Sequence, residues 1–177
     1  PQDTMANDTN MLERLKKNKP GGTVEIHIKN SQSDVFSTIK EIINNMGDGN
    51  IGILLSETKD VDDYSEALDE EEIEHSSYHS YIFYRKRRDI EKNLKNILIT
   101  TFKSAKGLEF DTVVMTEFDR ADEIDKKQYY VGATRARQYL YILCTSMPDL
   151  LNNFDSSTYI KSKGSSSTSD DYGDLPF

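Results

Sequence analysis

Short apolar runs recur along the chain and are separated by more polar segments. Runs of this kind, rich in β-branched and aromatic residues and bounded by turn formers, are typical of strands. We expect strands at 23–28, 51–55, 81–84, 97–101, 113–116 and 139–144. The run Ile51–Leu55 is apolar at successive positions, which is typical of a strand covered on both faces of its sheet.

Helical periodicity appears between several of these runs. Residues 33–46 place Val35, Ile39, Ile42 and Ile43 on one face, which predicts an amphipathic helix that ends at the Gly47-Asp48-Gly49 turn. Further helices are expected over 61–73, within 121–137 and, as a short segment, over 10–17. Strands that alternate with helices predict an α/β domain with a mostly parallel sheet, which binds ligands at the carboxyl ends of its strands.

The polar pattern also predicts how the chain is divided. Residues 1–19 form a polar amino-terminal segment, and residues 20–155 hold the alternating strands and helices. From residue 156 the periodic signals fade, and the serine-rich stretch 163–169 is typical of a flexible linker. We therefore expect one folded domain, followed by a flexible acidic tail over 156–177.

Composition excludes several classes of protein. The single cysteine, Cys144, rules out a disulfide framework and favours a cytoplasmic protein. The three histidines do not combine with it at zinc-ligand spacing, so no metal site is expected. No apolar run reaches the roughly 18–20 residues of a membrane span, so no membrane partner is expected.

Charge is unevenly distributed along a chain whose net charge is -9. Residues 60–74 hold nine carboxylates and no lysine or arginine, which is typical of a solvated face. A basic stretch follows, comprising Arg85, Lys86, Arg87, Arg88, Lys92, Lys95, Lys103 and Lys106. It is either solvated surface or a nucleic-acid contact.

The most informative segment is the loop expected between two strands at Thr100–Asp111, with the sequence TTFKSAKGLEFD. Hydroxyls and lysines suit phosphate groups, and Gly107 allows close approach of the backbone. Such a loop is typical of a site that meets phosphates or nucleic acid. Phe102 and Phe110 are expected in the core rather than as base-stacking side chains.

A second segment, YYVGATRAR over residues 129–137, lies ahead of the last apolar run. Arg135 is expected just beyond a helix and just before a buried strand. Its guanidinium stays charged and offers forked donors to phosphate oxygens. Taken alone, Arg135 is better explained as a member of a surface ion pair.

Together, the two segments resemble two signature motifs of the UvrD/Rep/PcrA-like superfamily 1 DNA helicases. The resemblance covers about residues 20–150 and implies a RecA-like (P-loop NTPase-type) three-layer domain, the second motor domain of an ATP-dependent DNA helicase or translocase of bacterial type. It implies that Arg135 contacts the γ-phosphate of ATP and acts in catalysis. The residues implied to face ATP are Lys106, Gly107, Glu109 and Arg135, and those implied to face DNA are Thr101, Lys103 and Ser104.

Two positions depart from the family pattern. Lys103 stands where the family usually has histidine, and a lysine still binds phosphate. Ser56 stands where the family has an arginine that reaches the γ-phosphate, so either Lys59 substitutes for it or this contact is missing.

The sequence contains no G-x-x-x-x-G-K-[ST] loop. The resemblance therefore implies that this chain supplies half of an ATP site, with ATP and Mg²⁺ bound mainly by an amino-terminal RecA-like domain. The chain alone is expected to be inactive, and its partners to be that domain and single-stranded or duplex DNA. The alternative is a degenerate, non-enzymatic helicase-like module that binds DNA or recruits repair partners.

The chain closes with SDDYGDLPF over residues 169–177. This segment resembles the acidic tip of bacterial single-stranded DNA-binding proteins, which docks on repair proteins. The resemblance implies that Asp174–Phe177 could dock on a DNA-repair partner. The alternative is an acidic tail whose last residues match by coincidence.

Overall fold

The computed structural model describes residues 22–116, 126–147 and 160–163. The short helix predicted over 10–17 and the peptide Asp174–Phe177 lie outside these ranges. The described elements follow one another as β1 (Thr23–Ile28), α2 (Gln32–Asn45), β2 (Ile51–Leu55), α3 (Thr58–Glu70), β3 (Ser76–Tyr78), α4 (Tyr84–Lys92), β4 (Ile97–Thr101), β5 (Phe110–Met115), α5 (Lys126–Ala133), β6 (Ala136–Cys144) and β7 (Ile160–Lys163).

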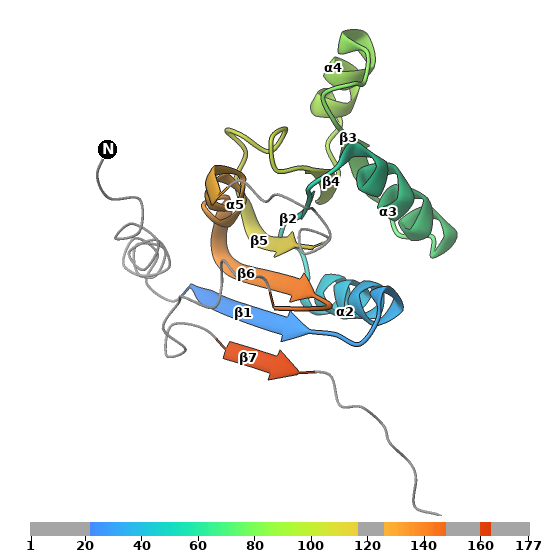
Figure 1. Cartoon of the computed structure of the whole chain (residues 1–177). Coiled ribbons are helices and arrows are strands. Elements are labelled where there is room, and N and C mark those ends of the chain that lie inside the picture. Colours follow the sequence, from blue (N-terminus) through green and yellow to red (C-terminus); the bar gives the residue numbers. More distant parts are fainter. Residues whose placement is uncertain (1–21, 117–125, 148–159, 164–177) are drawn as a thin grey trace, which may run out of the picture.

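The strands form a seven-stranded sheet in the order β3-β4-β2-β5-β6-β1-β7 (Figure 1). Neighbouring strands pair in parallel throughout this sheet. Two of the central strands, β2 and β4, are buried at every position. For β2 the continuous apolar sequence predicted this burial. The predicted α/β class with a mostly parallel sheet is confirmed.

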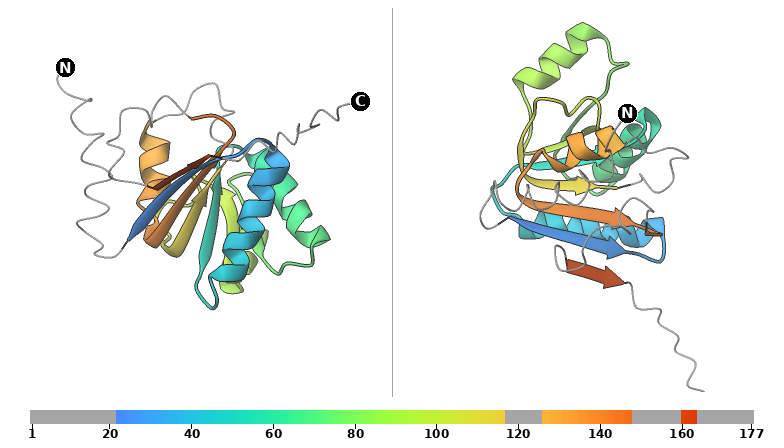
Figure 2. Two further views of the ribbon diagram at one scale, coloured as in Figure 1. Left: turned by 90° about the horizontal axis from the view of Figure 1, so that it is seen from below. Right: turned by 60° about the vertical axis from the view of Figure 1, so that its left-hand side comes forward.

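The sheet lies between two layers (Figure 2). On one face, α2 and α3 pack on a core that includes Ile39, Ile53 and Val114. On the other face, α5 and the connection between β4 and β5 pack on a second core that includes Phe102, Val113 and Leu140. The architecture therefore has three layers, as expected.

The helix α2 forms where the apolar periodicity predicted it. Its first turn is capped by Ser31, whose Oγ accepts a hydrogen bond from the backbone N–H of Asp34. Val35, Thr38, Ile39 and Ile42 are buried against the sheet. The chain turns away at Gly47, whose φ of 60° lies in the left-handed region that favours glycine.

Two predictions of secondary structure are corrected. Residues 81–84, predicted as a strand, form a turn and the first residue of α4, and the edge strand in this region is β3 instead. Tyr81, Phe83 and Tyr84 are exposed, so the apolar run does not mark a buried strand. The strand β7 pairs with β1 within the stretch assigned to a flexible tail, so residues 160–163 belong to the sheet.

A close contact between β2 and β5 explains the glycine in the middle of the apolar strand β2. A Cβ atom built on Gly52 would lie 2.6 Å from Cδ2 of Phe110, which is much closer than carbon atoms approach in proteins. Phe110 is 5% exposed and cannot swing into solvent without leaving the core. Glycine at 52 therefore allows the Phe110 ring to pack across the strand.

We expect Gly52→Ala to lower the free energy of unfolding by about 1–3 kcal/mol, because the added methyl group overpacks a filled core. Urea unfolding followed by circular dichroism measures this effect. Phe110→Leu removes ring atoms that the methyl group would meet, so the double variant should lose less stability than the sum of the two single variants. Strict additivity of the two losses would contradict the packing explanation.

Candidate nucleotide and nucleic-acid site

The connection 102–109 crosses one face of the sheet from edge to edge. Leu55 of β2 is level with Thr101, and Ile51 of β2 is level with Thr112. Because all these strands are parallel, the connection leaves the carboxyl edge after Thr101 and reaches the amino edge before Phe110. Its first residues and its last residues therefore lie at opposite edges of the sheet.

The first half of this connection is fixed by a pair of hydroxyl groups. Thr101 Oγ1 donates to Ser104 Oγ at 3.1 Å, and the backbone N–H of Ser104 donates to Thr101 Oγ1 at 3.2 Å. Both residues are buried, whereas Lys103 between them is exposed. Of the three residues expected to face DNA, only Lys103 presents its side chain to solvent in this structure.

The second half of the connection is open to solvent. Lys106, Gly107 and Glu109 are all exposed. Gly107 has a φ of 88°, and a Cβ atom added to it would meet no other atom within 4 Å. The glycine is therefore required by its left-handed backbone and not by crowding, and its peptide is accessible to a ligand.

Arg135 lies where the sequence predicted it, between α5 and β6. Its guanidinium donates to the carbonyl oxygens of Val131 and Leu108 at 3.1 and 3.2 Å, and to Thr134 Oγ1 at 3.1 Å. The backbone of the same residue accepts a hydrogen bond from the N–H of Phe110 at 2.9 Å. Arg135 therefore joins the end of α5 to the second half of the loop.

Arg137 forms a second link to the same half of the loop. Its guanidinium binds Glu109 Oε2 through Nε at 3.0 Å and through Nη2 at 2.9 Å. Both side chains are about half exposed, at 55% and 53%. The sequence offered one signal for this residue. Arg137 lies two positions after Arg135, on the other side of Ala136, the first residue of β6.

Packing also joins the two motifs. A Cβ atom on Gly132 would lie 2.8 Å from Cδ1 of Phe102 and 3.2 Å from Cε of Met115. Phe102 is 2% exposed and lies in the core on this face, as expected, and Phe110 is buried there too. The glycine of YYVGATRAR therefore lets α5 approach the loop closely enough for Arg135 to reach Leu108.

Ser56 does not lie with the other residues implied to surround the γ-phosphate. It follows the carboxyl end of β2, whereas Arg135 precedes the amino end of β6. Counted along the paired strands at about 3.3 Å per residue, Ser56 and Arg135 lie roughly 20 Å or more apart in the strand direction. Ser56 and Arg135 therefore do not meet the same phosphate within this domain.

The side chain of Lys59, considered as a substitute for the missing arginine, is on the same distant edge and pairs with Asp63 at 3.3 Å. For the nucleotide, the expectation that ligands bind at the carboxyl ends of the strands stays a prediction, and the positions of the implied residues differ from it. The residues implied to face ATP gather at the amino ends of β5 and β6, beside the last part of the loop. Only the residues implied to face DNA lie at the carboxyl edge.

These residues fit the edge of a nucleotide site rather than a whole one. An exposed lysine, an accessible glycine peptide and two arginines offer donors to phosphate oxygens. Among the described residues, no group of three or more histidine, cysteine or acidic side chains could hold a metal ion. The domain is thus an α/β unit that gathers side chains of phosphate-binding type beside one loop.

Comparison with protein families places a helicase domain on this part of the chain. Residues 96–143, which run from before β4 into β6, match the UvrD-like helicase C-terminal domain family. RecB of the RecBCD enzyme from Chlamydia pneumoniae is 30% identical over 86 residues, which is 45% of this chain and 8% of RecB. The resemblance to UvrD-like helicases is confirmed, while the chain spans less than a tenth of that relative.

Solved structures share the fold. The C-terminal domain of a possible DNA helicase from Lactobacillus plantarum WCFS1 aligns with a TM-score of 0.62 at 16% identity, over 90% of this chain and 97% of that one. Dbp5 of S. cerevisiae, bound to RNA and ADP BeF3, aligns with a TM-score of 0.65 at 18% identity, over 80% of this chain and 41% of that one. These likenesses concern the fold, and with the family match they support a C-terminal, RecA-like helicase domain.

No helix within the described ranges combines the length and the apolar character that crossing a membrane requires.

The two arginines beside the loop should differ in their effect on stability. Arg135→Ala leaves the partly buried Leu108 carbonyl without this donor and removes one of the two donors to the Val131 carbonyl, which keeps the Thr134 hydroxyl. It should lower the free energy of unfolding by about 1–3 kcal/mol. Arg137→Ala removes only a half-exposed ion pair and should change it by less than about 1 kcal/mol. Thermal and urea unfolding of both variants tests this order, and equal losses would contradict it.

Proposed function

We propose that this chain is the second motor domain of an ATP-dependent DNA helicase or translocase. In this proposal it completes an ATP site that it shares with an amino-terminal RecA-like P-loop domain, and it contacts single-stranded DNA. The observation that carries the proposal is the edge-to-edge course of the connection 102–109. Its exposed lysine at one edge suits a DNA backbone, and its accessible glycine at the other edge, beside two arginines, suits a nucleotide.

On the nucleotide side, Lys106 and the peptide of Gly107 would donate to phosphate oxygens, and Glu109 would lie near the ribose. Arg135 would stabilise charge on the γ-phosphate, which is the chemistry that such arginines supply in phosphoryl transfer. Its present partners are two carbonyl oxygens and a hydroxyl, so it would exchange these neutral acceptors for an anionic one. Arg137 holds Glu109 and becomes a positioning residue in this scheme.

On the DNA side, Lys103 would contact phosphate directly. Thr101 and Ser104 are bonded to each other and buried, so their role would be to set the turn that presents Lys103. Movement of one half of the loop would be transmitted to the other half through Phe102 and Ala105, which are both buried in the core. Nucleotide state and DNA contact would be coupled through this one segment.

A second candidate is a non-enzymatic helicase-like module that binds DNA or recruits DNA-repair proteins. The engagement of Arg135 within its own domain favours this alternative, because an arginine fully used in packing need not meet a nucleotide. The peptide Asp174–Phe177 is the proposed docking segment for a repair protein. The two candidates differ in whether Arg135 affects nucleotide turnover.

In a protein that joins this chain to its P-loop domain, Arg135→Ala should reduce ATP turnover by about 10³-fold or more, as for known arginine fingers. The affinity for ATP should change little, because most of the binding groups lie on the other domain. Steady-state ATPase assays and nucleotide titration measure the two effects. Arg137→Ala is the matched control, with a smaller loss of turnover, and similar turnover in the Arg135→Ala and unaltered proteins would refute the motor assignment of Arg135.

The 177-residue chain by itself should show no DNA-stimulated ATPase activity, because half a site cannot bind Mg²⁺ and all three phosphates together. The assay compares phosphate release with and without single-stranded DNA. Activity that depends on Arg135 in the isolated chain would mean that the site is complete here and that no second domain is needed.

A further inference from the structure

A cluster of aromatic side chains stands in solvent on the segment that leads into α4. Tyr81 is 82% exposed, Phe83 is 88% exposed and Tyr84 is 71% exposed. Isolated apolar residues on a surface need no explanation, but three large rings within four positions expose an unusual apolar area. The helix they introduce buries none of its own residues fully.

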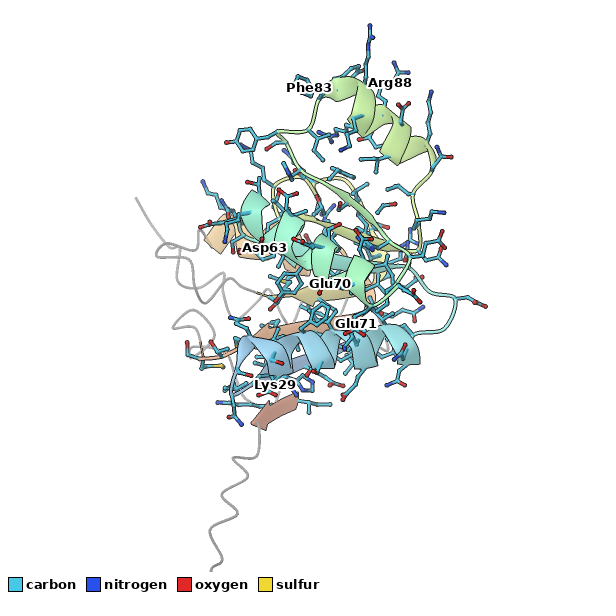
Figure 3. The ribbon with its side chains drawn as sticks, turned by 90° about the vertical axis from the view of Figure 1, so that its right-hand side faces the viewer. Lys29, Asp63, Glu70, Glu71, Phe83 and Arg88 are labelled. Atoms are coloured by element: carbon cyan, nitrogen blue, oxygen red, sulfur yellow. The ribbon has the colours of Figure 1, made fainter. Side chains whose placement is uncertain are left out.

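Positive charge surrounds these rings. Arg85, Lys86 and Arg88 are exposed, and no ion pair joins any of them to a described residue. The guanidinium of Arg88 lies 5.7 Å from the centre of the Tyr84 ring, within the range of a cation–π contact. Figure 3 shows Phe83 and Arg88 on the side of α4 that is farthest from α2.

The helix is held in place by residues beneath this surface. Arg87 lies over the Tyr78 ring at 5.1 Å and donates to Glu91 Oε1 at 2.8 Å. Ile82 and Ile90 pack against the core that contains Phe102. Burial raises the pKa of the Tyr78 hydroxyl above its usual value, so Tyr78 stays neutral beneath Arg87. Arg87 therefore serves the fold. The exposed rings make only local contacts, since Tyr81 meets the His79 ring edge-on with 6.2 Å between centroids and Tyr84 meets Arg88.

The position of this segment relates it to the DNA-facing half of the loop. Tyr78 at the end of β3 is level with Thr100 of β4, and the two strands are neighbours. Residues 79–83 and residues 102–104 therefore leave the same edge of the sheet from adjacent strands, which lie about 4.8 Å apart. A nucleic-acid strand bound at Lys103 could therefore extend across the surface to the segment that carries Tyr81, Phe83 and Tyr84.

We propose that Tyr81, Phe83 and Tyr84, with Arg85, Lys86 and Arg88, form a stacking surface for single-stranded nucleic acid. Bases would stack on the three rings, and the cations would contact the phosphates. Exposed aromatic rings interleaved with cations are the combination that binds single strands without sequence preference. The proposal adds a second surface to the DNA contact of the proposed function. It rests on that function only for the expectation that the bound nucleic acid runs from the rings toward Lys103.

Charge favours a nucleic acid over an apolar protein partner. The chain as a whole carries a net charge of -9, and α4 stands apart from the acidic helix α3, which carries Asp63 and Glu70 (Figure 3). A local group of exposed cations on such a chain attracts a polyanion to this place rather than to the rest of the surface. Duplex DNA would offer phosphates to the same cations, but its stacked bases present no faces to the rings.

Binding of the 177-residue chain to a fluorescein-labelled 15-nucleotide oligothymidine, followed by anisotropy at several salt concentrations without nucleotide, tests the proposal. Phe83→Ala and Tyr81→Ala should each weaken binding by about 5-fold or more, which is the lower end of measured base-stacking effects. Phe83→Leu should weaken it as much, because leucine keeps apolar bulk and lacks a π face. Replacing Arg85 and Arg88 by Gln should lower the salt dependence of log K by about 0.7 per residue.

Leu94→Ala is the matched control, since Leu94 is also exposed and follows α4. It should leave the affinity unchanged, and circular dichroism should show the same fold for every variant. The proposal is overturned if Phe83→Leu binds as the unaltered chain does, if duplex of equal length binds as tightly as the single strand, or if the unaltered chain does not bind at low salt. Lys103→Gln tests the loop separately: weakening there, with no effect of the aromatic variants, would overturn this proposal and leave the proposed function standing.

Discussion

The parallel register of β4, β2 and β5 is the constraint on which the rest of the site depends. Both outer strands pair with β2 in the same direction, so the eight residues 102–109 must travel the full height of the sheet without a helix. Phe102 and Ala105 hold this short connection against the core, and the Thr101–Ser104 pair fixes its first turn. A single segment consequently exposes one lysine at the carboxyl edge and a second lysine and a glycine toward the amino edge, which is the arrangement that a coupling element between two ligands needs.

The same constraint explains why the two glycines in the centre of the domain are needed. Gly52 admits the Phe110 ring where β5 begins, and Gly132 admits the Phe102 ring where the connection begins. These contacts bring α5 against the loop, and only then do the Leu108 carbonyl and Glu109 come within reach of Arg135 and Arg137. Core packing and the surface chemistry of the site are therefore not separable in this domain, because the close approach that stabilises the fold also assembles the site.

Much of the fold could be predicted from periodicity. The strands 23–28, 51–55 and 97–101 agree with the structure, because their continuous or alternating apolar positions have one stable placement in a covered sheet. The prediction failed at 81–84, where an apolar aromatic run belongs to the surface, and at 160–163, where a polar strand pairs on an edge. Both failures have one cause. An apolar pattern predicts a strand only where the apolar residues are buried, and neither the exposed rings of 81–84 nor the polar edge strand 160–163 meets that condition.

The sequence by itself determined the α/β class, the two motifs and the nature of their residues, since hydrophobic period and charged side-chain chemistry are local properties of the chain. Tertiary structure alone decided which of these residues meet. It turned Thr101 and Ser104 inward and placed Ser56 at the edge opposite Arg135. It also paired Arg137 with Glu109 and brought the exposed rings of 81–84 beside the edge that Lys103 occupies. The physical reason is that the direction and order of strands set the edge at which each loop emerges, and neither can be read from any single segment.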